Sequence, residues 1–174
     1  MKTLTLIVLF ISLPVMAQNA MNTRQEMAAK TATAYANKAE AKVQEFFSYL
    51  ELLTDPKLNP EMKTQVKQQA LSLFENNTAT LPDMFDTKNT TISVEALLTK
   101  AANQKQKVNF ALSEIAAVST EDVVNTWTLQ YVIVISGRKL NVKQVGILKD
   151  AYKTFGTEKK KVATLYLSNA EHVK

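Results

Sequence analysis

The sequence predicts an α+β fold in which three N-terminal helices pack on a curved, cone-like antiparallel sheet of about four long strands. Apolar residues recur at helical spacing through the first part of the chain, and beyond Lys107 they alternate with polar residues, as in half-buried strands. The 174 residues are 46% hydrophobic, which is enough apolar material for the core of one globular domain. Long strands twist and curl, so we expect the helices and the sheet to enclose a cone.

Three segments have the pattern of amphipathic helices. The first spans residues 22–54, and the two prolines of "TDPKLNP" end it because proline disfavours helix in the residue before it. The second begins with Asn59 as its cap and Pro60 in its first turn. The third begins with Ser93 as its cap and Glu95 in its first turn. The expected buried faces are, in chain order, Ala28, Ala32, Tyr35, Ala39, Val43, Phe46, Leu50 and Leu53; Met62, Val66, Ala70, Leu73 and Phe74; and Val94, Leu97, Leu98 and Ala101.

Four strands follow, and they form an antiparallel meander. Gly137 and Gly156 occupy the last two connections, where a turn needs a residue that tolerates positive φ. In the first strand the alternation slips near Glu114, as it does at a β-bulge. The expected strands are residues 107–118, 121–136, 138–155 and 159–168.

The second strand is apolar on both faces. Trp127 and Tyr131 share one face with leucine and isoleucine side chains, and Val132 and Val134 lie on the other. A strand with two apolar faces needs cover on both, whereas the helices of this arrangement form one layer. We therefore expect either the N-terminal helix or a second subunit to cover the outer face.

The first residues have the pattern of a secretory signal peptide. Lys2 precedes an apolar run that ends in small residues, which places cleavage between Ala17 and Gln18. An uncleaved anchor is the alternative, but the run is shorter than the roughly 20 residues a spanning helix needs. Residues 18–174 would then form a single domain without a membrane span. The chain has no cysteine, so disulfides are not used, which favours the bacterial periplasm or secretion by bacteria.

Three passages of the chain resemble the nuclear transport factor two-like superfamily, also called the cystatin-like cone fold. They are "VQEFFSYLELL" followed by "NPEMKTQVKQQALSLF", then "TTISVEALLTKA", and last "KVATLYLS", and the similarity spans roughly residues 31–169. The chain is also similar to small exported proteins of Bacteroidetes-type bacteria. The resemblance implies a pocket between sheet and helices, used for catalysis in some members and for binding or assembly in others. It also implies a homodimer formed through the open sheet face.

Enzymatic members of this superfamily place an acidic or histidine base inside the cone. The resemblance therefore makes two acids of this chain catalytic candidates. Asp150 has the strand parity of inward-facing residues, or alternatively is a strand-end residue shifted by a bulge near Gly146. Glu114 is either a second acid or an exposed carboxylate paired with a cross-strand lysine. The single histidine, His172, lies near the end of the chain. With one histidine, no cysteine and three glycines, the sequence predicts no metal site, phosphate loop or cofactor.

Four aromatic residues are candidates for lining a pocket for a small apolar ligand, since such sites are mostly apolar with a few polar groups. They are Phe110, Trp127, Tyr131 and Tyr152. The alternative is that these rings fill the core.

The net charge of +5 is concentrated late in the chain, where residues 138–174 hold nine Lys or Arg against three acids. The lysines occupy mostly alternate strand positions, which indicates a solvated face, and no nucleic-acid-binding motif accompanies them. We therefore expect no nucleic acid partner. Two functions remain open. One is a non-catalytic periplasmic module that binds a ligand or a periplasmic protein, or assembles, through its pocket or sheet face. The other is a small-molecule hydrolase, isomerase or dehydratase with Asp150 or Glu114 as base.

Overall fold

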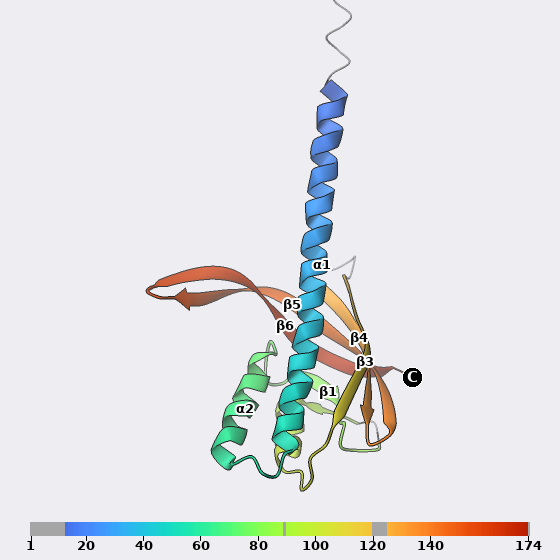
Figure 1. The fold of residues 1–174 in the computed structure, drawn as a ribbon, viewed down its shortest axis with the longest axis vertical. Helices are drawn as coiled ribbons and strands as arrows, with labels where there is room; N and C mark the ends of the chain where they lie inside the picture. Colours follow the sequence, from blue (N-terminus) through green and yellow to red (C-terminus); the bar gives the residue numbers. More distant parts are fainter. Residues whose placement is uncertain (1–12, 89, 120–124, 174) are drawn as a thin grey trace, which may run out of the picture. The chain divides into compact units, whose positions relative to one another are not determined.

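A computed structural model describes residues 13–88, 90–119 and 125–173, with the backbone alone for residues 13–29 and 118–119. It confirms an α+β fold with three helices and two antiparallel sheets (Figure 1). The helices are α1 (Leu13–Thr54), α2 (Pro60–Ser72) and α3 (Val94–Ala102). The strands are β1 (Thr80–Pro82), β2 (Thr91–Ser93), β3 (Phe110–Ser119), β4 (Thr126–Ile135), β5 (Arg138–Phe155) and β6 (Glu158–Val173).

The chain divides into two units, Met1–Tyr35 and Ala36–Lys174. The first holds the N-terminal part of α1, which begins earlier than the predicted residue 22. Residues 1–12, most of the predicted signal peptide, lie outside the described residues, so that interpretation stays a prediction. No described helix combines the length and apolar character that crossing a membrane requires.

The two shorter helices begin where their capping residues predict. The Asn59 side chain accepts a hydrogen bond from the backbone N–H of Met62 at 2.8 Å, with Pro60 as the first helical residue. The Ser93 hydroxyl accepts one from the backbone N–H of Ala96 at 3.2 Å. The predicted buried face of α3 is confirmed, because Val94, Leu97, Leu98 and Ala101 are all buried.

The main sheet is a meander in the order β3-β4-β5-β6. Gly137 and Gly156 turn the chain with φ of 82° and 63°, as predicted. The predicted slip in β3 is confirmed as a register shift between Ser113 and Ala116, where Glu114 has a φ of 55°. The final strand runs past the predicted residue 168 and ends at Val173.

A second, two-stranded sheet of β1 and β2 has no counterpart among the elements predicted from the sequence. Each strand has three residues, too few to show a period. The Asn169 side chain of β6 accepts a hydrogen bond from the backbone N–H of Thr80 at 2.9 Å, which ties β1 to the edge of the main sheet.

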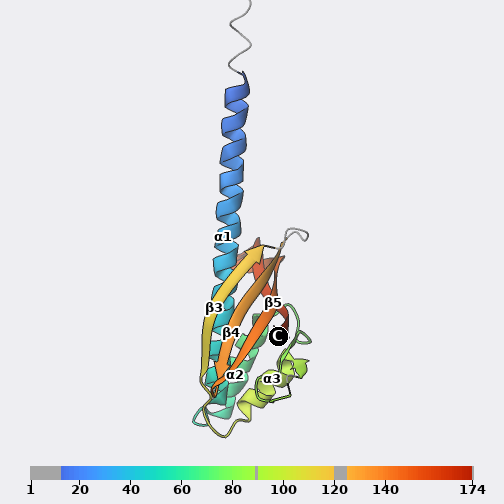
Figure 2. The same cartoon turned by 90° about the vertical axis from the view of Figure 1, so that its right-hand side faces the viewer.

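The hydrophobic core lies between one face of the main sheet, here called the inner face, and the helices, which Figure 2 shows behind β3, β4 and β5. The ring of Phe47 in α1 packs edge-on against Tyr131 of β4, with centroids 5.9 Å apart. Glu40 accepts a hydrogen bond from the backbone N–H of Ala117 in β3 at 3.2 Å. Within α1 the core residues are Ala39, Val43, Phe46, Phe47, Leu50 and Leu53.

Beyond the core, β5 and β6 continue as a two-stranded hairpin, which we call the arm (residues 149–163). The pairing of β4 with β5 ends at Thr126↔Ile147, so in the arm β5 and β6 pair only with each other. No residue of the arm is buried. Figure 1 shows the arm leaving the sheet at the left.

Candidate functional site

The opposite face of the main sheet, here called the outer face, is not covered by any described helix or strand. Because side chains alternate along a strand, the residues between the buried ones point to this face. Figure 2 views β3, β4 and β5 from this side, with no described ribbon in front of them. Its residues on the central strands are Thr126, Thr128, Gln130, Val132 and Val134 in β4, and Lys139, Asn141, Lys143, Val145 and Ile147 in β5.

The outer face of β4 and β5 is half apolar. Val132, Val134, Val145 and Ile147 are half-buried, although only their neighbours in the sheet shield them. The sequence predicted that both faces of β4 would be covered. The structure covers one face with α1 and leaves the other without a covering element among the described residues.

A hollow of about 490 Å³ lies on the outer face. The bulge places Glu114 there, and its positive φ breaks the alternation of β3. A second hollow of about 380 Å³ adjoins it along β6 and shares Lys143. The first is lined by Glu114, Gln130, Tyr131, Val132, Asn141, Val142, Lys143 and Val173.

The two predicted acids do not come together. Glu114 is exposed at the hollow, whereas Asp150 lies in the arm, 60% exposed, and pairs with Lys161 at 2.8 Å. The predicted irregularity near Gly146 is confirmed, but it does not shift β5. The pairing moves from Gln144↔Ala170 to Gly146↔Leu167, so the extra residue lies in β6. Asp150 therefore keeps the parity of inward-facing residues and is exposed because it lies beyond the helices.

The four aromatic candidates also lie apart. Trp127 and Tyr131 are buried in the core, and Phe110 packs its ring against Phe47 and Phe85. Tyr152 lies in the arm and is 75% exposed. Phe110 and Tyr131 both contact the ring of Phe47, whereas Tyr152 is far from the core, so the structure does not bring all four rings together.

A short chain of hydrogen bonds crosses the core beneath the hollow. The Tyr131 hydroxyl donates to Oε1 of Gln144 at 2.9 Å, and Nε2 of Gln144 donates to the carbonyl of Ser168 at 3.0 Å. Burial raises the pKa of Tyr131, so the phenol stays neutral. Sequence reasoning missed this chain. Its one signal was Gln144, a polar residue at an inward-facing position.

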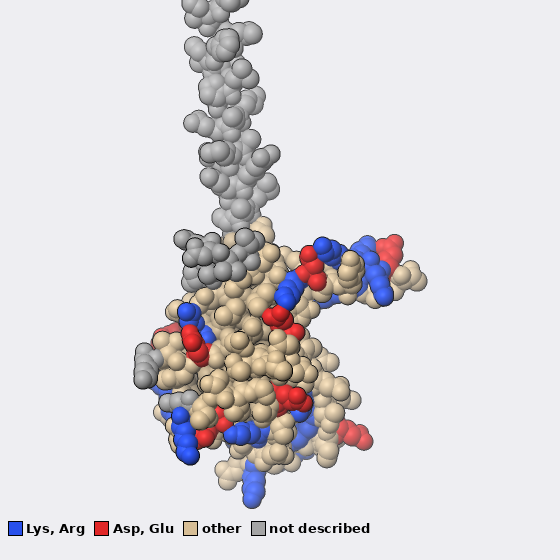
Figure 3. All heavy atoms as spheres, turned by 180° about the vertical axis from the view of Figure 1, so that it is seen from behind, with Lys and Arg blue, Asp and Glu red and all other residues tan. Residues whose placement is uncertain are grey.

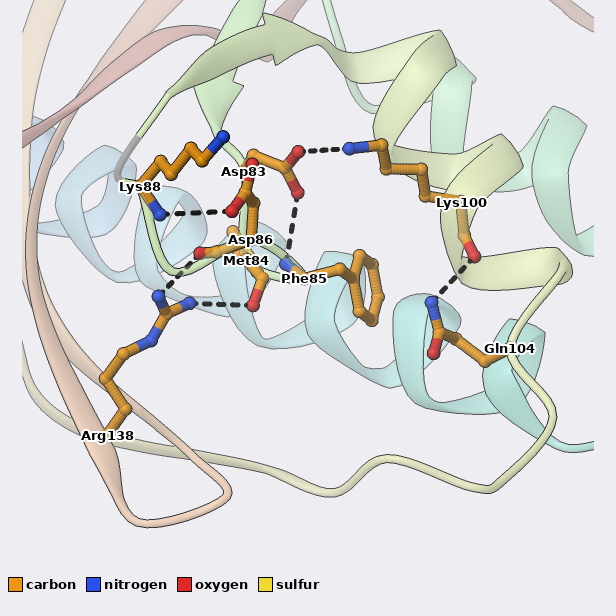
Figure 4. A network of polar contacts seen from close by, with 8 residues as sticks. All are labelled: Asp83, Met84, Phe85, Asp86, Lys88, Lys100, Gln104 and Arg138. Atoms are coloured by element: carbon orange, nitrogen blue, oxygen red, sulfur yellow. Dashed lines mark hydrogen bonds and ion pairs between the residues drawn. The ribbon is translucent and has the colours of Figure 1, made fainter.

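A polar network fixes the loop between β1 and β2 (Figure 4). The guanidinium of Arg138 donates to the carbonyls of Met84, at 2.9 Å, and Asp86, at 2.5 Å. The buried carboxylate of Asp83 pairs with Lys100 and accepts a hydrogen bond from the backbone N–H of Phe85 at 3.1 Å. A hollow of about 330 Å³ lies beside Arg138, but the guanidinium is bound to the loop, so the network is structural.

Within the described part of the chain, no three His, Cys, Asp or Glu residues lie close enough to hold a metal ion. No family model, curated protein or solved structure matches the chain. The functional argument therefore rests on the surface of the molecule itself.

Proposed function

We propose that this chain is an exported, non-catalytic assembly module that forms a homodimer through the outer face of its main sheet. The observation that supports it is a row of half-buried valine and isoleucine side chains on β4 and β5 without a covering element among the described residues. Apolar patches of this kind on soluble proteins mark interaction sites.

A second copy is the partner that the charges of this face fit best. Glu114 and Glu171 lie on it with Lys139 and Lys143, so acids and bases are balanced. In a two-fold interface each residue meets the same surface of its twin, and a balanced face can pair its acids with the twin's lysines. A face of one sign would repel its copy.

The sequence supports the other parts of the proposal. The apolar leader ending at Ala17 fits export to the periplasm or secretion, and the absence of cysteine fits stabilisation by packing alone. Three helices followed by a meander are consistent with a cone-like fold related to the nuclear transport factor two-like superfamily. Dimerisation through the open face is what that resemblance implies.

The enzyme alternative has less support. A general base must lie near the reacting proton in a site that holds the substrate. Asp150 is solvated in the arm, and Glu114 is at an open hollow whose other polar groups are Gln130, Asn141 and Lys143.

Sedimentation equilibrium tests the dimer. We expect twice the chain mass at micromolar concentrations, falling toward the chain mass on dilution. Val132→Asp places a charge at the centre of the interface. The dissociation constant of the dimer should increase at least tenfold, because the charge is buried without a partner.

The matched control is Gln68→Asp, the same new charge on the exposed surface of α2, which should leave the dimer intact. A parent protein that is monomeric at every concentration up to the highest soluble one would overturn the proposal. Thermal unfolding of both variants separates a lost interface from a lost fold.

A further inference from the structure

The arm presents cationic and aromatic side chains together. Residues 149–163 hold five lysines and two acids. Figure 3 shows the arm at the right, with blue side chains along it. Two aromatic rings, Tyr152 and Phe155, are 75% and 54% exposed. Large exposed apolar side chains on a projecting hairpin are costly in water, which indicates a partner.

The position of Phe155 indicates that a partner would contact the end of the arm. Phe155 pairs with Glu158 across the turn that contains Gly156, so its ring is at the tip. The next pair is Thr154 with Lys159, whose side chains are on the opposite face, and Lys153 pairs with Lys160 behind it. An aromatic tip flanked by cations is the combination that suits a lipid–water interface, where rings enter the headgroup region and lysines meet lipid phosphates.

Part of this charge is available to a partner. Lys160 pairs with Glu158 at 3.1 Å and Lys161 with Asp150 at 2.8 Å, both in exposed pairs that contribute little. Lys153 and Lys159 form no ion pair with any described residue.

We propose that the arm docks the protein onto the surface of an anionic lipid bilayer, with Phe155 entering the interface and Lys153 and Lys159 contacting lipid phosphates. This surface is separate from the outer face proposed for dimerisation, so either can fail without the other.

Nucleic acid is the competing anionic partner, and the geometry of the arm favours lipid over it. Residues three apart on a strand point to opposite faces, so Tyr152 and Phe155 cannot form one stacking platform for successive bases. A hairpin tip that enters a lipid interface is surrounded by it and uses both faces.

Vesicle sedimentation tests the proposal with the full chain. We expect binding to vesicles of phosphatidylglycerol and phosphatidylcholine in equal parts, weaker binding as salt increases, and little binding to phosphatidylcholine alone. Lys153→Gln with Lys159→Gln should weaken binding about 30-fold, and Phe155→Ser about tenfold. The control is Lys57→Gln with Lys105→Gln, which removes two exposed lysines outside the arm and should have little effect.

Phe155→Trp gives an independent readout, because its emission should shift to the blue with anionic vesicles while the buried Trp127 stays constant. Four results would overturn the proposal. They are no binding to either vesicle, equal binding to both, an equal loss in the control, or tighter binding to a DNA oligonucleotide that the arm variants abolish.

Discussion

The paired strands β5 and β6 pass through two surroundings, the main sheet and the arm. In the sheet, Leu140 and Val142 of β5 point to the inner face and are buried beneath the helices. In the arm, Asp150 and Tyr152 have the same parity and still pair with β6, yet both are exposed. Alternation therefore determines the side to which a residue points. Whether that side is buried depends on whether a helix covers that part of the strand.

The two regions should also differ in how much their aromatic residues stabilise the fold. Phe46 of α1 is 1% exposed and meets the rings of Phe47 and Phe74 at centroid distances of 5.4 and 4.9 Å. We expect Phe46→Ala to lower the free energy of unfolding by about 4 kcal/mol, because it removes a buried ring and leaves a cavity. Urea unfolding followed by circular dichroism measures it.

Phe155→Ala makes the same chemical change in the arm and serves as the matched variant. Its ring has few neighbours, so the free energy of unfolding should change by no more than about 0.5 kcal/mol. Equal losses in the two variants would show that the arm is packed in solution and would contradict its separation from the core.

Sequence alone predicted the elements that depend on local chemistry. The caps Asn59 and Ser93, the turn glycines and the bulge at Glu114 all act within a few residues of themselves, so their signals are present in the linear pattern. The pair of β1 and β2 escaped prediction because each strand has three residues, and β1 is held by Asn169, which is distant in the chain.

The acids of the two regions form the second contrast. Asp83 has a side chain only 1% exposed and accepts hydrogen bonds from Lys100 and from the backbone of Phe85. Asp83→Ala should lower the free energy of unfolding by about 2 kcal/mol, because charge-assisted bonds are lost and a partly buried N–H is left unpaired. Urea unfolding measures the change.

Asp150→Ala, in the arm, should leave the free energy of unfolding unchanged, because both partners of the pair with Lys161 are solvated. If this variant were as destabilising as Asp83→Ala, the pair would have to be shielded from solvent, against the geometry of the arm.

The candidate site was harder to predict than the elements, because it depends on what covers each strand. Strand parity grouped Trp127 and Tyr131 on one face, which the structure shows to be the inner one, and it gave Asp150 and Tyr152 the parity of inward-facing residues. The end of the helical cover, which separates these pairs, is a property of the whole fold. The contacts of Arg138 with loop carbonyls likewise join segments distant in sequence.

The smallest expected effect is the loss of the buried Tyr131 hydroxyl, and its size should depend on pH. At pH 7, Tyr131→Phe should lower the free energy of unfolding by about 1 kcal/mol, since it removes the hydrogen bond to Gln144. Burial raises the pKa of Tyr131 above the unfolded value of about 10. The unfolded chain therefore loses this proton first, and the stability that the neutral phenol provides is complete below pH 10 and declines above it.

At pH 11 the parent should have lost about 1.4 kcal/mol through this linkage, whereas Tyr131→Phe has no phenol to ionise. The difference between the two proteins should then vanish or reverse sign, and all other titrating groups cancel in the comparison. At pH 7, Tyr152→Phe, whose ring is solvated in the arm, should match the parent and is the control for removing a hydroxyl. Urea unfolding followed by Trp127 fluorescence gives these differences. A constant deficit for Tyr131→Phe from pH 7 to pH 11 would mean that its hydroxyl reaches water, and that the inner face under the hollow is as open as the arm.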